Sequence, residues 1–259
     1  MCLALASAGT FSEVSLYASQ AVAEDALGAE DIAQRIVRGN GFTWEGAKTK
    51  LRMIVAEPNG DKKEREMEVL GRRHEGRLQT KVTFLSPQDS AGTKFLTVEK
   101  SGGGTEQHIY LPAYKRTRRV VGREREGSFM GSDFTYSDLV RKDDQGTKHK
   151  KLPDESIGAD ATYVLESTPG SVEEAGYSKI KTWVRKTDFV PLRTQFFDAS
   201  GKLKKTLYVR EIGKLEGKPV VKKALMKSEN GHATELIIDD VQPRNDLPDS
   251  DFSPTSLEH

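Results

Sequence analysis

Most of the chain alternates between apolar and polar residues with a period of two. In residues 48–55, the apolar side chains share one face of an extended strand, and lysine and arginine side chains share the other. Asn59-Gly60 follows as a hairpin turn, because this pair tolerates positive φ. The returning stretch places Met67 and Val69 between glutamates. We therefore expect antiparallel strands with one wet face, on which opposed charges form cross-strand pairs worth about 0.2–1 kcal/mol each.

Short stretches with this alternation recur to the end of the chain, separated by turns rich in Gly, Asn and Asp. Their spacing predicts an antiparallel meander of roughly eleven strands. After the first pair, the expected strands are 78–85, 93–100, 107–111, 162–166, 178–185, 190–197, 203–212, 219–227 and 234–241. The polar stretch 142–153 is expected to be a loop.

Two stretches near the start have helical spacing instead. In Ala29–Arg38, Ile32 and Ile36 lie four residues apart, with acidic residues at the start and arginines near the end. Those charges complement the helix dipole, and Gly39-Asn40-Gly41 predicts the stop. Residues 12–27 also permit a helix.

An open meander this long has to curl, and its apolar face needs a cover. The candidates for that cover are the amino-terminal helix and residues 128–140, which we call the covering segment. In this segment, aromatic residues and methionine cluster on a glycine-rich backbone. Apolar side chains on irregular backbone usually cover something. Ser132 or Asp133 is expected to cap a short helix there, and Gly127 with Gly131 is expected to provide a hinge.

Three blocks of sequence resemble a known family. The most specific is Tyr110–Leu139, which contains YLPAYKRTRR and GSFMGSDFTYSDL. The others are Asp188–Leu207 and the stretch from Gly231 to Phe252. Together they resemble the bacterial outer membrane lipoprotein-sorting protein family, relatives of the LolA and LolB carriers, over most of the chain after about residue 29.

The resemblance implies a single α+β domain that is mainly antiparallel β. It implies an incomplete β-barrel, a half-barrel made from one curved sheet, with a few helices over its open side. It also implies a ligand cavity for acyl chains, although an ordinary packed core is the default for the same residues. The candidate cavity residues are Leu51, Met53, Phe84, Phe95, Phe129, Met130, Phe134, Tyr136, Leu139, Val184, Phe196, Leu207 and Leu236.

No composition break divides the chain, so we expect one domain over residues 29–256. Residues 1–28 have features of a signal-peptide remnant or an N-terminal extension, with an A-x-A pattern at Ala21–Ala23 that predicts export to the periplasm. Residues 257–259 are expected to be a tag remnant. No run approaches the roughly 20 apolar residues of a membrane span.

Composition excludes several classes of function. The formal net charge is +1, which gives no global field for nucleic acid. One cysteine excludes an intramolecular disulfide and a cysteine-based zinc site. The histidines are scattered, and no phosphate-loop, dinucleotide or nucleophile-elbow motif is present. We therefore expect no metal, no cofactor and no catalysis.

A basic run, residues 115–125, is most simply a solvated face. Arg118 and Arg119 are its candidates for contact with phosphate head groups or with an acidic partner, because a guanidinium fork suits phosphate. The sequence leaves two functions open. One is a monomeric periplasmic carrier that moves a lipid or lipoprotein acyl group between membranes. The other is a ligand-free adaptor of an inner-membrane transporter.

Overall fold

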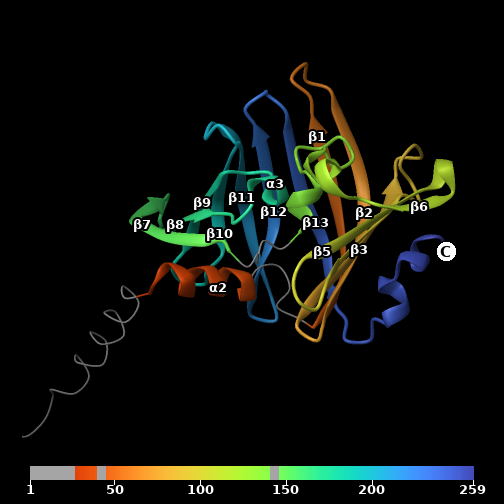
Figure 1. Cartoon of the computed structure of the whole chain (residues 1–259), viewed down its shortest axis with the longest axis horizontal. Coiled ribbons are helices and arrows are strands. Elements are labelled where there is room, and N and C mark those ends of the chain that lie inside the picture. Colours follow the sequence, from red (N-terminus) through yellow and green to blue (C-terminus); the bar gives the residue numbers. More distant parts are fainter. Residues whose placement is uncertain (1–26, 40–44, 141–145) are drawn as a thin grey trace, which may run out of the picture.

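The computed structural model describes residues 27–39, 45–140 and 146–259, and one curved antiparallel sheet dominates it (Figure 1). The strand order is β6-β5-β4-β3-β2-β1-β13-β12-β11-β10-β9-β8-β7. The strands are β1 (Gly46–Ala56), β2 (Lys62–His74), β3 (Arg77–Ser86), β4 (Lys94–Glu99), β5 (Thr105–Leu111), β6 (Arg116–Arg119), β7 (Lys148–Ile157), β8 (Asp160–Thr168), β9 (Lys179–Arg185), β10 (Pro191–Phe197), β11 (Leu203–Leu215), β12 (Lys218–Ser228) and β13 (Ala233–Pro243).

The pairing of β1 with β13 joins two meanders into one sheet. As a result, β6 and β7 follow each other in sequence but form opposite edges of the sheet. The covering segment lies in the connection between them. The chain therefore has to cross one face of the sheet at this point.

Short helices complete the described fold. They are α2 (Ala29–Gly39), α3 (Val172–Ala175) and the 3-10 helices η1 (Pro112–Tyr114), η2 (Gly122–Glu126), η3 (Tyr136–Leu139), η4 (Asp249–Phe252) and η5 (Pro254–Leu257). No helix of the described residues has the length and hydropathy needed to cross a membrane. Residues 12–26 of the possible helix at 12–27, and the helix stop at 40–41, lie outside the described residues.

The predicted meander is confirmed, but the described sheet has thirteen strands. The expected loop at 142–153 was wrong from residue 148 onward, because β7 begins there. This edge strand is polar on both faces and contains Pro153, near which its pairing with β8 shifts register between Leu152 and Glu155. The strand β6 was also missed, because its four residues are three arginines and one threonine. Edge strands tolerate both features, so neither strand shows apolar alternation.

The sheet has two different faces. The inner face carries a cluster that includes Met53, Phe84 and Phe95, and the covering segment packs on it. On the outer face, the predicted charge pairs are present. Lys48 contacts Glu68 at 2.8 Å, and Arg52 contacts Glu64 at 3.3 Å and Asp239 at 2.9 Å.

The predicted helix at 29–38 is confirmed as α2, which extends to Gly39. It covers the inner face at the β7 side of the sheet. Ile32, fully buried, and Ala33 pack against Tyr163, Leu165 and Val184. Two separate covers therefore share the inner face, one at each side of the sheet.

The carboxyl-terminal residues pack on the outer face over β2 to β5. Phe252 and Leu257 form a cluster with Leu96, and the Arg72 guanidinium lies 4.6 Å from the centre of the Phe252 ring. Arg72 also contacts Asp249 at 2.6 Å. Leu257 is thus packed against the sheet, and the tag remnant at residues 257–259 stays a prediction.

Leu257→Ala is predicted to lower the free energy of unfolding by about 2–4 kcal/mol, because this side chain is fully buried. Leu85→Ala is the matched control, since Leu85 is 47% exposed, and we expect a change below about 0.5 kcal/mol. Urea unfolding measures both. Equal effects of the two substitutions would show that the carboxyl-terminal residues do not pack as described.

Candidate functional site at the covered inner face

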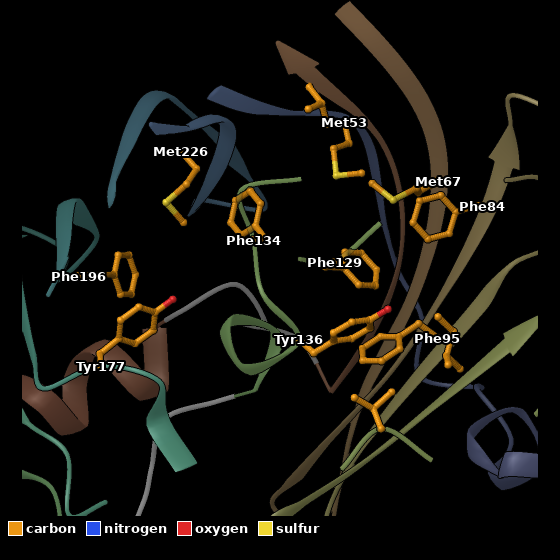
Figure 2. Close-up of a cluster of buried hydrophobic side chains, with 13 residues drawn as sticks. Met53, Met67, Phe84, Phe95, Phe129, Phe134, Tyr136, Tyr177, Phe196 and Met226 are labelled. Carbon is orange, nitrogen blue, oxygen red and sulfur yellow. The ribbon is translucent and has the colours of Figure 1, made fainter. Parts of the chain in front are cut away.

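The covering segment places three aromatic rings on the inner face (Figure 2). The Phe129 ring centre lies 5.7 Å from that of Phe84 and 5.2 Å from that of Phe95. Tyr136 packs on the same group, 5.4 Å from Phe95 and 5.5 Å from Phe129 in an edge-on arrangement. Such offset geometries add about 0.5–1.5 kcal/mol per pair beyond burial. The site is thus filled by the protein's own side chains.

A tight hairpin turn forms the first half of the covering segment. The Phe129 amide donates to the Phe134 carbonyl at 2.7 Å, and the Ser132 amide donates to the Phe129 carbonyl at 3.0 Å. Between them Met130 and Gly131 have φ values of 53° and 73°. Positive φ at both central positions is the type I′ turn geometry. Gly131 therefore has a conformational reason to be glycine, whereas Gly127 is extended, with φ −66°.

The second half of the segment is the 3-10 helix η3. The expected cap at Ser132 or Asp133 was wrong, because Thr135 is the N-cap and forms a capping box with Asp138. Ser132 and Asp133 have other roles. The Ser132 hydroxyl donates to the Phe129 carbonyl at 2.7 Å, which stabilises the turn. The Asp133 carboxylate accepts hydrogen bonds from Ser228 and Thr234 on the sheet.

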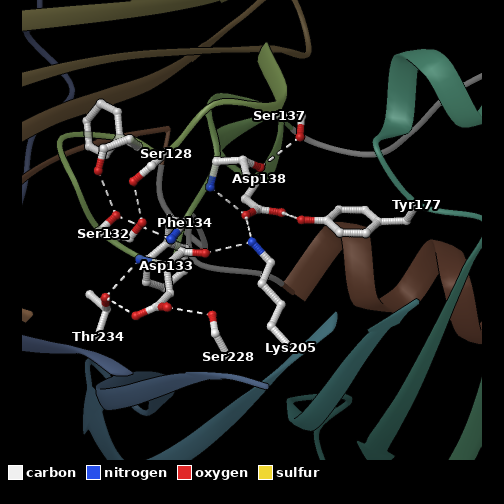
Figure 3. A network of polar contacts seen from close by, with 12 residues as sticks. Ser128, Ser132, Asp133, Phe134, Ser137, Asp138, Tyr177, Lys205, Ser228 and Thr234 are labelled. Atoms are coloured by element: carbon white, nitrogen blue, oxygen red, sulfur yellow. Dashed lines mark hydrogen bonds and ion pairs between the residues drawn. The ribbon is translucent and has the colours of Figure 1, made fainter. Parts of the chain in front are cut away.

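A buried lysine attaches the segment to β11 (Figure 3). The Lys205 Nζ donates to the Asp133 carbonyl at 2.7 Å and to the Asp138 carboxylate. The Tyr177 hydroxyl donates to the other oxygen of Asp138 at 2.8 Å. The Lys205 and Asp138 side chains are only 2% and 6% exposed, so this ion pair is withdrawn from water.

Burial shifts the proton affinities of this network. It lowers the pKa of the Lys205 ammonium, while the neighbouring Asp138 carboxylate acts in the opposite direction. Burial also raises the pKa of the Tyr177 hydroxyl, and the charge of Asp138 adds to that shift. Tyr177 is therefore a neutral hydrogen-bond donor at physiological pH. Removing one partner of such a buried pair costs about 3–5 kcal/mol, because the other charge is left uncompensated.

The covering segment is attached to the sheet by side chains. Its backbone hydrogen bonds connect residues of the segment with one another or with Gly127, which precedes it. One example is the 3.3 Å bond from the Tyr136 amide to the Gly127 carbonyl. The contacts to the strands come from Lys205, Ser228, Thr234 and Gln107, whose amide donates to the Tyr136 carbonyl at 2.7 Å. The segment therefore keeps its own fold without a backbone ladder to the sheet.

The structure brings together most of the candidate cavity residues. In one cluster, Met53, Phe84, Phe95, Phe129, Phe134, Tyr136 and Phe196 are buried, and Leu51, Met130, Leu139, Leu207 and Leu236 are partly buried. Val184 lies apart from them, in the cluster under α2. The partly buried members supply apolar surface at the margin of the packed rings.

A pocket of about 470 Å³ lies beside the covering segment, and its lining is polar. Lys205, Ser228 and Asp133 line it together with exposed residues such as Lys202 and Glu229. None of the candidate cavity residues lines it. This space therefore gives access to the polar network and not to the aromatic cluster.

Arg118 and Arg119 lie on the edge strand β6 with acidic partners. Arg118 pairs with Glu124, and Arg119 lies 3.4 Å from Glu106. Both arginine side chains are exposed. Among the described residues, no group of three or more His, Cys, Asp or Glu side chains is placed to hold a metal ion.

Sequence reasoning missed Lys205, Asp138 and Tyr177. One signal was present, because Lys205 occupies a position that alternates with Leu203 and Leu207 on the inner side of β11. A lysine at an apolar position needs a partner when buried. The partner, Asp138, comes from a segment 67 residues earlier, so its identity depends on the tertiary fold.

Together, the curved sheet, α2 and the covering segment define an open half-barrel protein with a covered apolar inner face. A similar structure is an outer membrane lipoprotein-sorting protein domain from Vibrio parahaemolyticus, with 31% identity, a TM-score of 0.82 and alignment over 90% of this chain and 98% of that one. The chain belongs to this outer membrane lipoprotein-sorting protein family.

Other comparisons agree on the fold. A DUF1329 family protein from Desulfovibrio piger has 24% identity and a TM-score of 0.83, over 88% of this chain and 97% of that one. A LolA superfamily protein from Nitrosomonas europaea has 22% identity and a TM-score of 0.71, over 88% and 98%. A family model described as "-like: Uncharacterized protein" matches residues 76–259. No curated protein matches the chain.

Lys205→Met is predicted to lower the free energy of unfolding by about 3–5 kcal/mol, because it leaves the Asp138 carboxylate buried without its cation. Lys205→Met/Asp138→Asn should cost clearly less than the sum of the two single substitutions. Urea unfolding of all four proteins gives the coupling energy.

Lys227→Met is the control, since Lys227 is exposed on the neighbouring strand β12 and should have an effect within about 0.5 kcal/mol. Additive effects of the Lys205 and Asp138 substitutions would mean that the two residues do not act as a pair.

Proposed function

We propose that this protein is a non-enzymatic periplasmic carrier that holds an acyl chain of a lipid or lipoprotein on the inner face of its half-barrel. In this proposal, the covering segment occupies the ligand's place when no ligand is bound and moves aside when an acyl chain enters. Family membership supports the class of cargo, since a close structural relative is described as a lipoprotein-sorting domain.

The attachment of the covering segment is the observation that carries the proposal. The segment fills the apolar face with Phe129, Phe134 and Tyr136, yet its backbone hydrogen bonds stay local. A segment of this kind detaches without unpairing a strand. An acyl chain would then replace one set of apolar contacts by another on the same surface.

The energies of this exchange are comparable. Burying a 16-carbon chain contributes on the order of 12 kcal/mol at about 0.8 kcal/mol per methylene. Exposing a buried large apolar side chain costs about 1.5–3 kcal/mol, and the segment has three of them in addition to its ion pair. The covering segment therefore offsets most of the gain from binding. A carrier needs such a balance, because it has to release its cargo.

The remaining parts of the proposal concern place and partners. LolA-like relatives suggest the periplasm, and we propose that the protein acts there as a monomer that exchanges cargo with an inner-membrane transporter. Arg118 and Arg119 remain candidates for contact with that partner or with head groups. Their glutamate partners reduce the charge available for this role.

A ligand-free adaptor of a membrane transporter is the second candidate. The packed inner face favours the adaptor, because the aromatic rings of the covering segment already cover the apolar surface of the sheet. An adaptor needs no exchange at this face. The two functions differ in whether the covering segment has to move.

A disulfide between the covering segment and β13 tests this difference. The Asp133 amide and the Thr234 Oγ1 lie 2.9 Å apart, so Asp133→Cys/Thr234→Cys is a suitable pair, made in a Cys2→Ser background that removes the natural cysteine. We expect the oxidised protein to bind a fluorescent fatty acid at least about tenfold more weakly than the same protein after reduction, because the closed segment blocks the inner face.

The Cys2→Ser protein without the added pair is the control, and its binding should not respond to reductant. Equal binding by the oxidised and reduced pair would contradict movement of the segment. Absence of binding in every form, including the unmodified chain, would favour the adaptor.

A further inference from the structure

One arginine lies on the inner face without a counterion among the described residues. Arg65 on β2 is directly opposite Met53 on β1, and Met67 follows two residues later on the same strand. Directly opposed residues of an antiparallel pair share a face, so Arg65 shares the apolar inner face with these two methionines. Met53 and Met67 are both buried. The neighbouring acids Glu64 and Glu66 alternate onto the outer face.

The guanidinium of Arg65 is incompletely satisfied. Its Nε and Nη1 are both buried, and neither has a hydrogen-bond partner. Two other arginines have a buried Nε without a partner, but each has a further contact. Arg125 donates through Nη2 to the Thr105 carbonyl, and Arg193 stacks on Trp183 at 3.6 Å. Arg65 has no such contact among the described residues.

No ion pair joins Arg65 to an acid among the described residues. Inner-face positions of β1, which neighbours β2, and of β13 beyond it carry Met53, Val55, Leu236 and Thr234, and the other neighbour, β3, carries Phe84 opposite Met67. The acid of the covering segment that contacts β13, Asp133, already accepts from Ser228 and Thr234. A buried donor without an acceptor costs about as much as a lost hydrogen bond, and more when it is charged. Such a group indicates a partner from outside the chain.

We propose that Arg65 binds the anionic head group, a carboxylate or a phosphate, of an amphiphile whose chain lies on the inner face. This inference rests on the proposed carrier function and narrows its cargo. The fork of Nε and Nη donors matches both kinds of oxyanion, and the adjacent methionines adapt to a flexible chain. An acyl group joined only through uncharged amide and ester bonds offers Arg65 no counterion. The site therefore favours anionic lipids over neutral ones.

The test compares ligands that share one chain and differ in head group. Oleate, oleoyl lysophosphatidate and mono-oleoylglycerol are titrated into the delipidated, full-length protein at low ionic strength. We expect an anionic ligand to bind about tenfold or more tightly than the neutral one. Arg65→Met should reduce this preference to within about threefold and leave binding of the neutral ligand nearly unchanged. Preference for oleate or for lysophosphatidate identifies the head group as carboxylate or phosphate.

Two further variants make the result specific. Lys62→Met removes an exposed cation of the same strand and should keep the preference, so it controls for general charge attraction. Arg65→Lys keeps the positive charge but loses the paired donors of the guanidinium, so it should retain part of the preference for anionic ligands. This variant also tests the inference if Arg65→Met folds poorly.

Several outcomes would overturn the inference. If the unmodified protein binds neutral and anionic ligands equally, Arg65 has no head-group role, while the carrier function stands. A preference that survives Arg65→Met would also exclude this residue. Tight binding of inorganic phosphate alone would show a free-anion site and not an amphiphile site. Failure to bind any of the three lipids would contradict the carrier function itself.

Discussion

The chain has to travel from β6 to β7, which are opposite edges of the same sheet, and residues 128–140 lie on its path across the inner face. This topological requirement places Phe129, Phe134 and Tyr136 on the apolar surface that a curved, open sheet leaves uncovered. The cover is therefore part of the connection and not an added element. A segment that crosses a sheet without joining its ladder is also a segment that can leave it.

The attachment of that segment combines two kinds of interaction. Aromatic packing is non-directional and tolerates exchange for another apolar partner. The buried contacts of Lys205 with Asp138 and the Asp133 carbonyl are directional, so they define one closed position. Replacing a buried ion pair by apolar residues is often neutral for stability, whereas its directional contacts still select one geometry. In this protein it holds a cover whose apolar contacts alone would allow several positions.

Much of the fold follows from local sequence. Alternation along β1 and β2 predicts the strands, the inner face and the outer-face pair between Lys48 and Glu68. Helical spacing at Ile32 and Ile36 predicts α2. The edge strands β6 and β7 could not be found in this way. A solvent-exposed edge strand can have polar residues on both faces, so it shows no apolar alternation.

The site was predictable only in part. Its aromatic residues cluster in sequence and were found, whereas Val184 shares their alternation but lies under α2. The network around Lys205 and the unpaired Arg65 depend on contacts between residues far apart in the chain. Arg65 alternates with Met67 along β2, but only the three-dimensional arrangement reveals that its nitrogens have no partner.

Hydrogen exchange on the unliganded and lipid-saturated protein reports whether the covering segment leaves the inner face when lipid binds. The amides of Phe129, Ser132 and Tyr136 are bonded within or next to the covering segment, and those of β3 to β5 are bonded within the sheet. We expect lipid to lower the protection of amides across the covering segment and to leave the strand amides unchanged or more protected. Lipid binding with full protection of the covering segment would contradict this expectation.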